Sequence, residues 1–133
     1  MRNIMSETTV LLVDDDADFL LQGRLQLEQL GCRVIEARSR REAVTILEGT
    51  RPDAAVIDLM MEDPDAGFTL AYQIKGRYPD VPVIMTTAVT SATGLTFEKV
   101  PGQDWIRADV ILSKPVRAAQ LRAELERLLG HVL

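Results

Sequence analysis

Three consecutive aspartates, Asp14 to Asp16, directly follow an aliphatic run, and a fourth carboxylate stands at Asp18. Carboxylates packed side by side repel one another, and each makes ionisation of its neighbours less favourable. A bound cation would relieve this repulsion, because hard divalent ions prefer oxygen ligands. Open solvent around a loop, or a role for one aspartate as a helix cap, would also relieve it. These residues alone leave a metal site and a solvated loop as alternatives.

Further polar side chains follow other apolar runs, and together they suit phosphoryl transfer. The candidates for this chemistry are Asp14, Asp15, Asp58, Thr87 and Lys114. A carboxylate can attack phosphorus as a nucleophile, whereas a hydroxyl and an ammonium can bind phosphoryl oxygens. Mg²⁺ typically takes one or two protein carboxylates together with water and phosphate oxygens. Phosphoryl transfer needs little more than an in-line nucleophile and positive charge on the equatorial oxygens.

The elements that must position these side chains are short apolar runs alternating with longer amphipathic stretches. The runs predict five strands: Thr9–Val13, Cys32–Ala37, Ala54–Ile57, Val83–Met85 and Val110–Leu112. Leucines and other apolar residues at helical spacing, with capping residues, predict helices over Ala17–Leu30, Ser39–Gly49, Asp65–Arg77 and Arg117–Leu129. This alternation predicts a parallel sheet covered by helices on both faces.

The carboxyl ends of parallel strands share one edge of a sheet, and ligands bind in the crevice outside that edge. All five candidate residues stand at such ends, so we expect them to converge although they are far apart in the chain. Taken singly, an aspartate there is more often a cap or turn residue. Thr87 could likewise be a strand-end residue whose hydroxyl only makes a structural hydrogen bond, and Lys114 could be a solvated surface lysine. Their joint placement favours a functional site.

Composition excludes several other classes of chemistry. Cys32 is the single cysteine and His131 the single histidine, so an internal disulfide, a thiolate cluster and Ser-His or Cys-His catalysis are excluded. A net charge of −5 and a pI near 4.9 argue against nucleic-acid binding. No apolar run approaches the roughly 18 residues of a membrane span, and no signal segment opens the chain. We therefore expect a cytoplasmic protein that forms one domain over residues 1–133, structured from about 8 to 130.

Four short motifs together resemble the receiver domains of two-component response regulators, of the chemotaxis-regulator type. They are VDD (Val13–Asp15), VIDLMM (Val56–Met61), MTTA (Met85–Ala88) and SKP (Ser113–Pro115). Each motif is weak alone, but the resemblance in this order covers essentially the whole chain. It implies a flavodoxin-like, doubly wound α/β fold with a five-stranded parallel sheet of order 2-1-3-4-5.

The resemblance also implies a role for each residue that binds the phosphoryl group. Asp58 would be the phosphoacceptor, and Thr87 would donate a hydrogen bond to a phosphoryl oxygen in the activated domain. Lys114 would pair with Asp58 or with its phosphate. Pro115 would follow a cis peptide bond, which proline permits at low cost.

The same resemblance implies a Mg²⁺ site. Asp15, Asp58 and the backbone carbonyl of Met60 would bind the ion directly, whereas Asp14 would act mainly through a coordinated water. Asp16 matches no ligand position, and we interpret it as a helix N-cap.

These roles imply a phosphorelay signalling domain that takes phosphate from a histidine kinase or a histidine phosphotransfer protein. We expect a domain that assists its own phosphorylation and dephosphorylation rather than an enzyme. It would be a monomer or weak homodimer that binds neither nucleic acid nor membrane and acts on an output partner the sequence does not name. The alternative is a phosphorylation-independent interaction module that keeps the same pocket. A haloacid-dehalogenase-type hydrolase is excluded, because Met60 replaces the acid of its motif.

Three features depart from the family pattern. The loop after the acceptor reads DLMMEDPDAG, with one residue inserted before Gly67. Ile111 stands where receivers commonly have a tyrosine or phenylalanine that moves with the threonine after strand four. The segment Ser91–Trp105 is interrupted by Gly94 and Pro101, so we expect a further helix there, the fourth helix in chain order, to be short or irregular. We also expect phosphorylation to reorder this segment while Ile111 stays packed.

Overall fold

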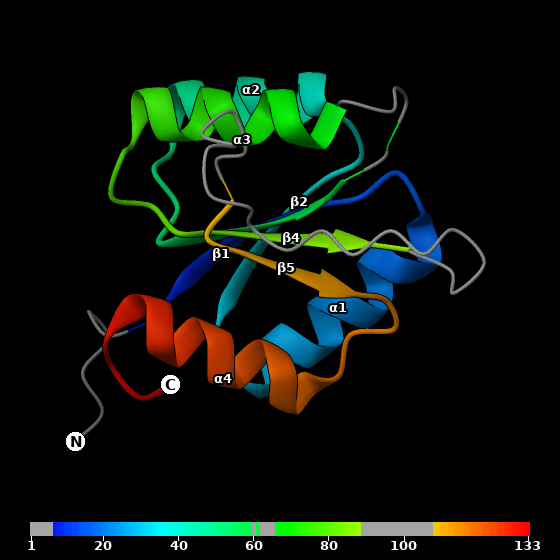
Figure 1. Cartoon of the computed structure of the whole chain (residues 1–133), viewed down its shortest axis with the longest axis vertical. Coiled ribbons are helices and arrows are strands. Elements are labelled where there is room, and N and C mark those ends of the chain that lie inside the picture. The colour runs from blue at the N-terminus through cyan, green and yellow to red at the C-terminus, as the bar shows by residue number, and fades with distance from the viewer. Residues whose placement is uncertain (1–6, 60, 62–65, 89–107) are drawn as a thin grey trace, which may run out of the picture.

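The computed structural model describes residues 7–59, 61, 66–88 and 108–133. Its strands form one parallel sheet in the order β2-β1-β3-β4-β5 (Figure 1). They are β1 (Thr9–Val13), β2 (Arg33–Ala37), β3 (Ala54–Asp58), β4 (Val83–Thr87) and β5 (Val110–Ser113). The doubly wound sheet of order 2-1-3-4-5 is therefore confirmed.

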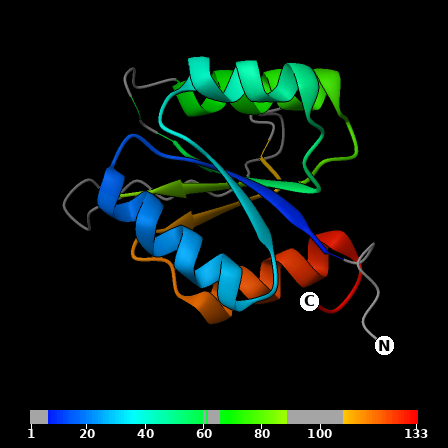
Figure 2. The same cartoon turned by 180° about the vertical axis from the view of Figure 1, so that it is seen from behind.

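Helices cover both faces of this sheet. They are α1 (Ala17–Gln29), α2 (Arg40–Gly49), α3 (Ala66–Arg77) and α4 (Ala118–Leu129). Helices α2 and α3 lie on one face, and α1 and α4 lie on the other (Figures 1 and 2). Each of the four predicted helices is present, with ends that differ by at most one residue. None of the helices in the described ranges is long and apolar enough to cross a membrane. The short or irregular helix expected within Ser91–Trp105 lies outside the described residues.

Helix α1 begins at a side-chain cap and is followed by a glycine. Oδ1 of Asp16 accepts hydrogen bonds from the backbone N–H groups of Asp18, at 2.9 Å, and Phe19, at 3.3 Å. Asp16 is therefore the N-cap, as predicted. Just beyond the helix, Gly31 has a φ of 89°, a left-handed conformation that side chains disfavour.

Ser39 caps the start of α2, but the reciprocal bond of a full capping box is shifted by one residue. Oγ of Ser39 accepts the N–H of Glu42 at 3.1 Å. The Glu42 carboxylate, however, accepts the N–H of Arg38 at 2.9 Å rather than that of the cap residue. The extended backbone of Ser39 presents the preceding N–H to the carboxylate, and the reciprocal bond shifts by one residue.

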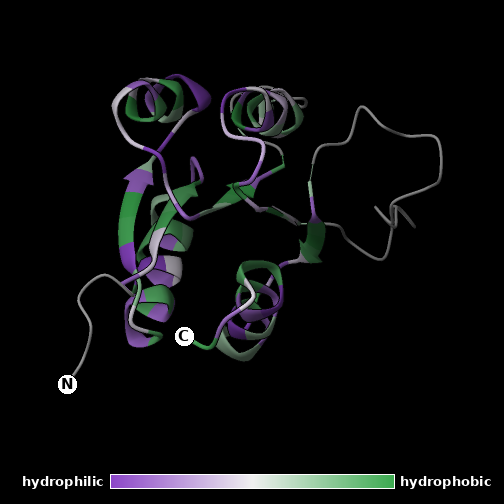
Figure 3. Cartoon of the chain, turned by 90° about the vertical axis from the view of Figure 1, so that its left-hand side faces the viewer, coloured by the Kyte–Doolittle hydropathy of each residue, from purple (hydrophilic) through white to green (hydrophobic). Residues whose placement is uncertain are grey.

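The core has two layers because successive residues of a strand point to opposite faces of the sheet. In β1, Leu11 and Val13 pack with the layer beneath α2 and α3, whereas Val10 and Leu12 pack with the layer beneath α1 and α4. Burial on both faces explains why the central strands are continuous aliphatic runs. Figure 3 shows these hydrophobic strands between helices that also carry hydrophilic residues.

Strand β4 extends two residues beyond the predicted Val83–Met85. Thr86 pairs with Asp58 of β3, and Thr87 pairs with Ser113 of β5. Backbone pairing on both sides continues the strand although its last two side chains are polar. Both threonines are buried, so the Thr87 side chain belongs to the edge of the sheet rather than to a loop.

Candidate functional site

The carboxylates of Asp14, Asp15 and Asp58 converge at the carboxyl edge of the sheet. Each offers one oxygen, and these three oxygens lie within 4.8 Å of one another. Strand β1 leads into the first two residues and the neighbouring β3 carries the third, with Val13 opposite Ile57 in the register. Asp14 and Asp58 are buried, whereas Asp15 is exposed. The structure thus brings together the three carboxylates that the sequence predicted to converge.

Lys114 reaches the same cluster from the end of β5. Its Nζ lies 2.9 Å from Oδ2 of Asp14 and 3.5 Å from Oδ1 of Asp58. Its backbone N–H donates to the carbonyl of Thr87 at 2.8 Å, and the peptide bond to Pro115 is cis, as predicted. The shorter contact is with Asp14, so the lysine bridges two carboxylates rather than pairing with Asp58 alone.

The donor set fits a hard divalent cation. Three carboxylates against one ammonium leave the cluster with a formal charge of −2, and buried like charges at such distances repel strongly. The exposed side at Asp15 leaves room for the water and phosphate oxygens that complete a Mg²⁺ shell. The carbonyl of Met60, the further ligand expected from the resemblance, lies outside the described residues.

Removing the exposed carboxylate should nearly abolish Mg²⁺ binding. Two direct carboxylates and one carbonyl would leave roughly half of an octahedral shell to water, so binding without phosphate should be weak and sensitive to each ligand. We expect Asp15→Ala to lose the heat of Mg²⁺ binding in isothermal titration.

A matched control is Asp18→Ala, because Asp18 is an exposed carboxylate in the first turn of α1 and lies outside the cluster. It removes the same charge from the same region and should keep nearly wild-type affinity, because Asp18 contributes no oxygen to the cluster. Equal affinity losses in both variants, or none in Asp15→Ala, would contradict the coordination.

Two threonines end β4 beside the carboxylates. Thr86 stands opposite Asp58 in the register, and its Oγ1 lies 3.4 Å from the carbonyl oxygen of Ile57. Thr87 follows one residue further towards the carboxyl edge, and its carbonyl anchors Lys114. The candidate phosphoryl-binding hydroxyl therefore belongs to the strand that flanks the acceptor.

Gly67, in the first turn of α3, lies against the end of the acceptor strand. A Cβ at this position would meet the carbonyl oxygen of Asp58 at 2.5 Å, and Cα and the carbonyl oxygen of Leu59 at 2.6 Å. Its N–H donates to the Leu59 carbonyl at 3.0 Å. No local sequence pattern reports this close approach, because it depends on how α3 packs against the end of β3.

The single thiol takes no part in the site. Cys32 is buried in the core layer beneath α1 and α4. Burial, and secondarily the negative charge of Asp53, raises the pKa of this thiol above its usual value. A thiol with a raised pKa is a poor nucleophile and metal ligand, in keeping with a site built from oxygen ligands.

The family model described as "Response regulator receiver domain" matches residues 10–126. Response regulator MprA of Mycolicibacterium vanbaalenii is 35% identical over 120 residues, which cover 90% of this chain and 49% of that protein. The chain spans about half the length of the curated relatives it matches.

Solved structures of receiver domains share the fold. A CheY-like response regulator receiver domain protein from Methanospirillum hungatei JF-1 superposes with a TM-score of 0.78 at 23% identity, over 94% of this chain and 95% of that one. The BeF3-activated DrrB receiver domain has a TM-score of 0.77 at 26% identity, over 94% of this chain and 99% of that one.

Proposed function

Because the chain belongs to the response regulator receiver domain family, we propose that it accepts a phosphoryl group on Asp58 from a histidine kinase or a histidine phosphotransfer protein. The observation that carries the proposal is the joint placement of three carboxylates and one lysine at the carboxyl edge of the sheet. A structural cap or a surface ion pair would not need two buried carboxylates beside a third.

In the proposed reaction, an oxygen of the Asp58 carboxylate attacks the phosphorus of a phosphohistidine. The P–N bond breaks, its electron pair leaves with the imidazole nitrogen, and an aspartyl phosphate forms. Lys114 donates hydrogen bonds to a phosphoryl oxygen, since its Nζ already lies 3.5 Å from the attacking carboxylate. The Thr87 hydroxyl binds a second phosphoryl oxygen.

Asp15 and Asp58 would hold Mg²⁺ directly, and the bound ion would supply positive charge to the phosphoryl oxygens. Asp14 suits an indirect role, because both of its oxygens already accept hydrogen bonds. Oδ1 accepts the N–H of Asp16 at 2.9 Å, and Oδ2 accepts from Lys114 at 2.9 Å.

We further propose that phosphate changes the binding of an output partner and that the domain is a signalling device rather than an enzyme. Ile111, paired with Met85 in the sheet and half-buried, has neither ring nor hydroxyl to relocate. The proposed change must therefore use elements other than this position. The segment Ser91–Trp105, expected to respond, lies outside the described residues.

The direct test is incubation with acetyl phosphate or phosphoramidate in the presence of Mg²⁺. The intact mass should rise by one phosphoryl group, and chelation of the metal should prevent the change. Borohydride reduction converts an aspartyl phosphate to homoserine, and peptide mapping should place that residue at position 58. Absence of labelling with these donors and with a phosphorylated histidine phosphotransfer protein would overturn the proposal and favour the phosphorylation-independent module.

A further inference from the structure

The ammonium of Lys114 has a third contact, with an aromatic ring on α1. Its Nζ lies 4.0 Å from the centroid of the Phe19 ring, well within the about 6 Å over which a cation is attracted to a ring face. The Lys114 side chain is only 18% exposed. Such attraction is stronger when the cation is withdrawn from water, so this contact is well placed to orient the lysine.

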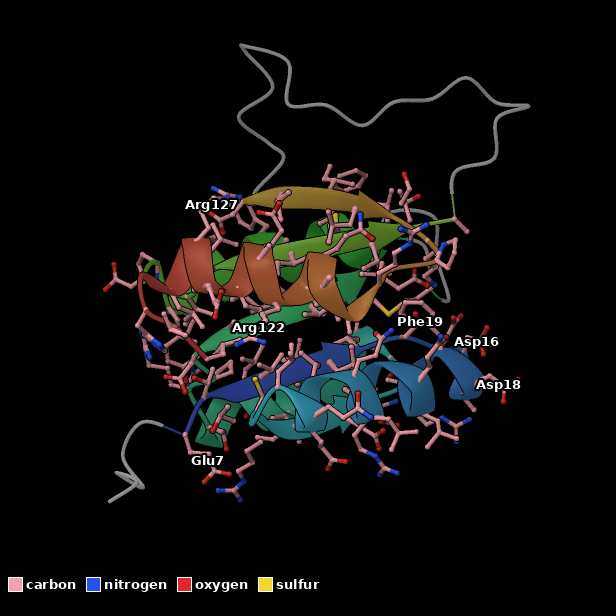
Figure 4. The ribbon with its side chains drawn as sticks, turned by 90° about the horizontal axis from the view of Figure 1, so that it is seen from below. Glu7, Asp16, Asp18, Phe19, Arg122 and Arg127 are labelled. Carbon is pink, nitrogen blue, oxygen red and sulfur yellow. The ribbon has the colours of Figure 1, made fainter. Side chains whose placement is uncertain are left out.

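The fold holds the Phe19 ring in place. The Phe19 N–H donates to Oδ1 of the cap residue Asp16, and the side chain packs, partly buried, on the core layer beneath α1 and α4. Figure 4 shows Phe19 at the N-terminal end of α1 beside Asp16, at the opposite end of the molecule from Arg127. The ring therefore stands at the same edge as the carboxylate cluster.

We propose that Phe19 is a positioning residue that keeps the Lys114 ammonium directed at the phosphoryl site when Asp58 changes partners. This inference rests on the proposed function and assigns a further residue to its phosphoryl-transfer step. The other described contacts of the ammonium are with Asp14 and Asp58, and both carboxylates lie in the candidate metal cluster. In the proposed step Asp58 turns its oxygens to the cation and to phosphorus and so holds the lysine less firmly, whereas Asp14 keeps its 2.9 Å hydrogen bond from Nζ.

The ring contact differs from the carboxylate contacts because it is uncharged. An aromatic ring does not ligate a hard cation, so its contact with the ammonium persists when a metal binds. The ring face carries no charge to neutralise the ammonium, so the N–H donors of Lys114 that are not bound to Asp14 can still reach phosphoryl oxygens. Preserved orientation of a charged group in this way raises the rate of a transfer step.

Substitution of Phe19 separates this role from simple packing. Phe19→Leu keeps an apolar side chain and removes the ring, whereas Phe19→Tyr keeps the ring. With acetyl phosphate at saturation and Mg²⁺ present, we expect the leucine variant to be phosphorylated about three- to tenfold more slowly, and the tyrosine variant within about twofold of wild type. A small-molecule donor removes any effect on docking of a kinase.

Leu128→Ala provides the packing control, since Leu128 is partly buried against the same core layer from the far half of α4. It should lower the thermal midpoint and leave the saturated rate of phosphorylation unchanged.

The chain has only three lysines, Lys75, Lys99 and Lys114, so lysine-selective labelling gives a readable NMR spectrum. The ring current should shift the Hε protons of Lys114 upfield in wild type and in Phe19→Tyr but not in Phe19→Leu.

The outcomes are separable. Three results would each overturn the positioning role while Asp58 is still labelled. The folded Phe19→Leu variant could be phosphorylated as fast as wild type, or the folded Phe19→Tyr variant as slowly as Phe19→Leu. The third is a wild-type spectrum without the upfield shift. A wild type that accepts no phosphate overturns the proposed function, and the positioning role falls with it.

Discussion

Asp58→Asn should take up no phosphoryl group from acetyl phosphate under conditions that label the wild type fully. A neutral amide is a poor nucleophile, and loss of a covalent nucleophile lowers rates by about a thousandfold or more. The substitution is nearly isosteric at a buried position that Lys114 and the register partner Thr86 surround. Intact-mass spectrometry over a time course measures the effect directly.

Electrostatics argues against misfolding of this variant, and the thermal midpoint of unfolding tests that point. Asp58→Asn removes one of three clustered carboxylates, which relieves repulsion with Asp14 and Asp15. The metal-free variant should therefore melt at or above the wild-type temperature. A thermal midpoint below that of the wild type would indicate that labelling is lost because the fold is lost.

Asp16→Asn is the matched control for this experiment. Asparagine caps helices about as well as aspartate, and the Asp16 carboxylate caps α1 rather than joining the cluster. This variant should be labelled at the wild-type rate. If the Asp58→Asn variant is labelled, or if the Asp16→Asn variant is not, then the roles proposed for the three consecutive aspartates and for the acceptor are wrong.

Gly67→Ala should both destabilise the domain and slow phosphorylation. The added Cβ would lie 2.5 to 2.6 Å from backbone atoms of Asp58 and Leu59, and backbone cannot give way as the tip of a side chain can. We expect a loss of about 1–3 kcal/mol in the free energy of unfolding, as for other overpacked sites. Displacement of the acceptor strand should slow labelling by about tenfold or more, because small misplacements of reacting groups are costly.

Gly76→Ala is the control within the same helix. Among the residues that the structure describes, a Cβ at Gly76 would meet no heavy atom of another segment within 4 Å, and alanine favours helix by about 1 kcal/mol over glycine. Urea unfolding should show this variant to be as stable as wild type or more so, with unchanged labelling. If Gly67→Ala is as stable and as readily labelled as the wild type, then α3 does not pack against the acceptor strand as closely as described.

Much of this fold was open to prediction because the signals are local. Aliphatic runs and helical spacing report burial within a few residues, and the alternation of strands and helices then predicts a parallel sheet. The polar residues at strand ends could be assigned to one edge from topology alone. Asp16 as a cap follows from the same local chemistry, since the donors it serves are two and three residues away.

Other features depend on which elements come into contact in the folded chain, and local sequence patterns do not report those contacts. Lys114 lies closer to Asp14 than to Asp58, because the path of the chain after β5 sets where its ammonium ends. Gly67 is required by a backbone approach of α3 to β3. The Phe19 ring meets that ammonium only because α1 and the end of β5 reach the same corner of the sheet. Sequence determined the elements and the edge they share; packing in three dimensions decided which partner each charge finds there.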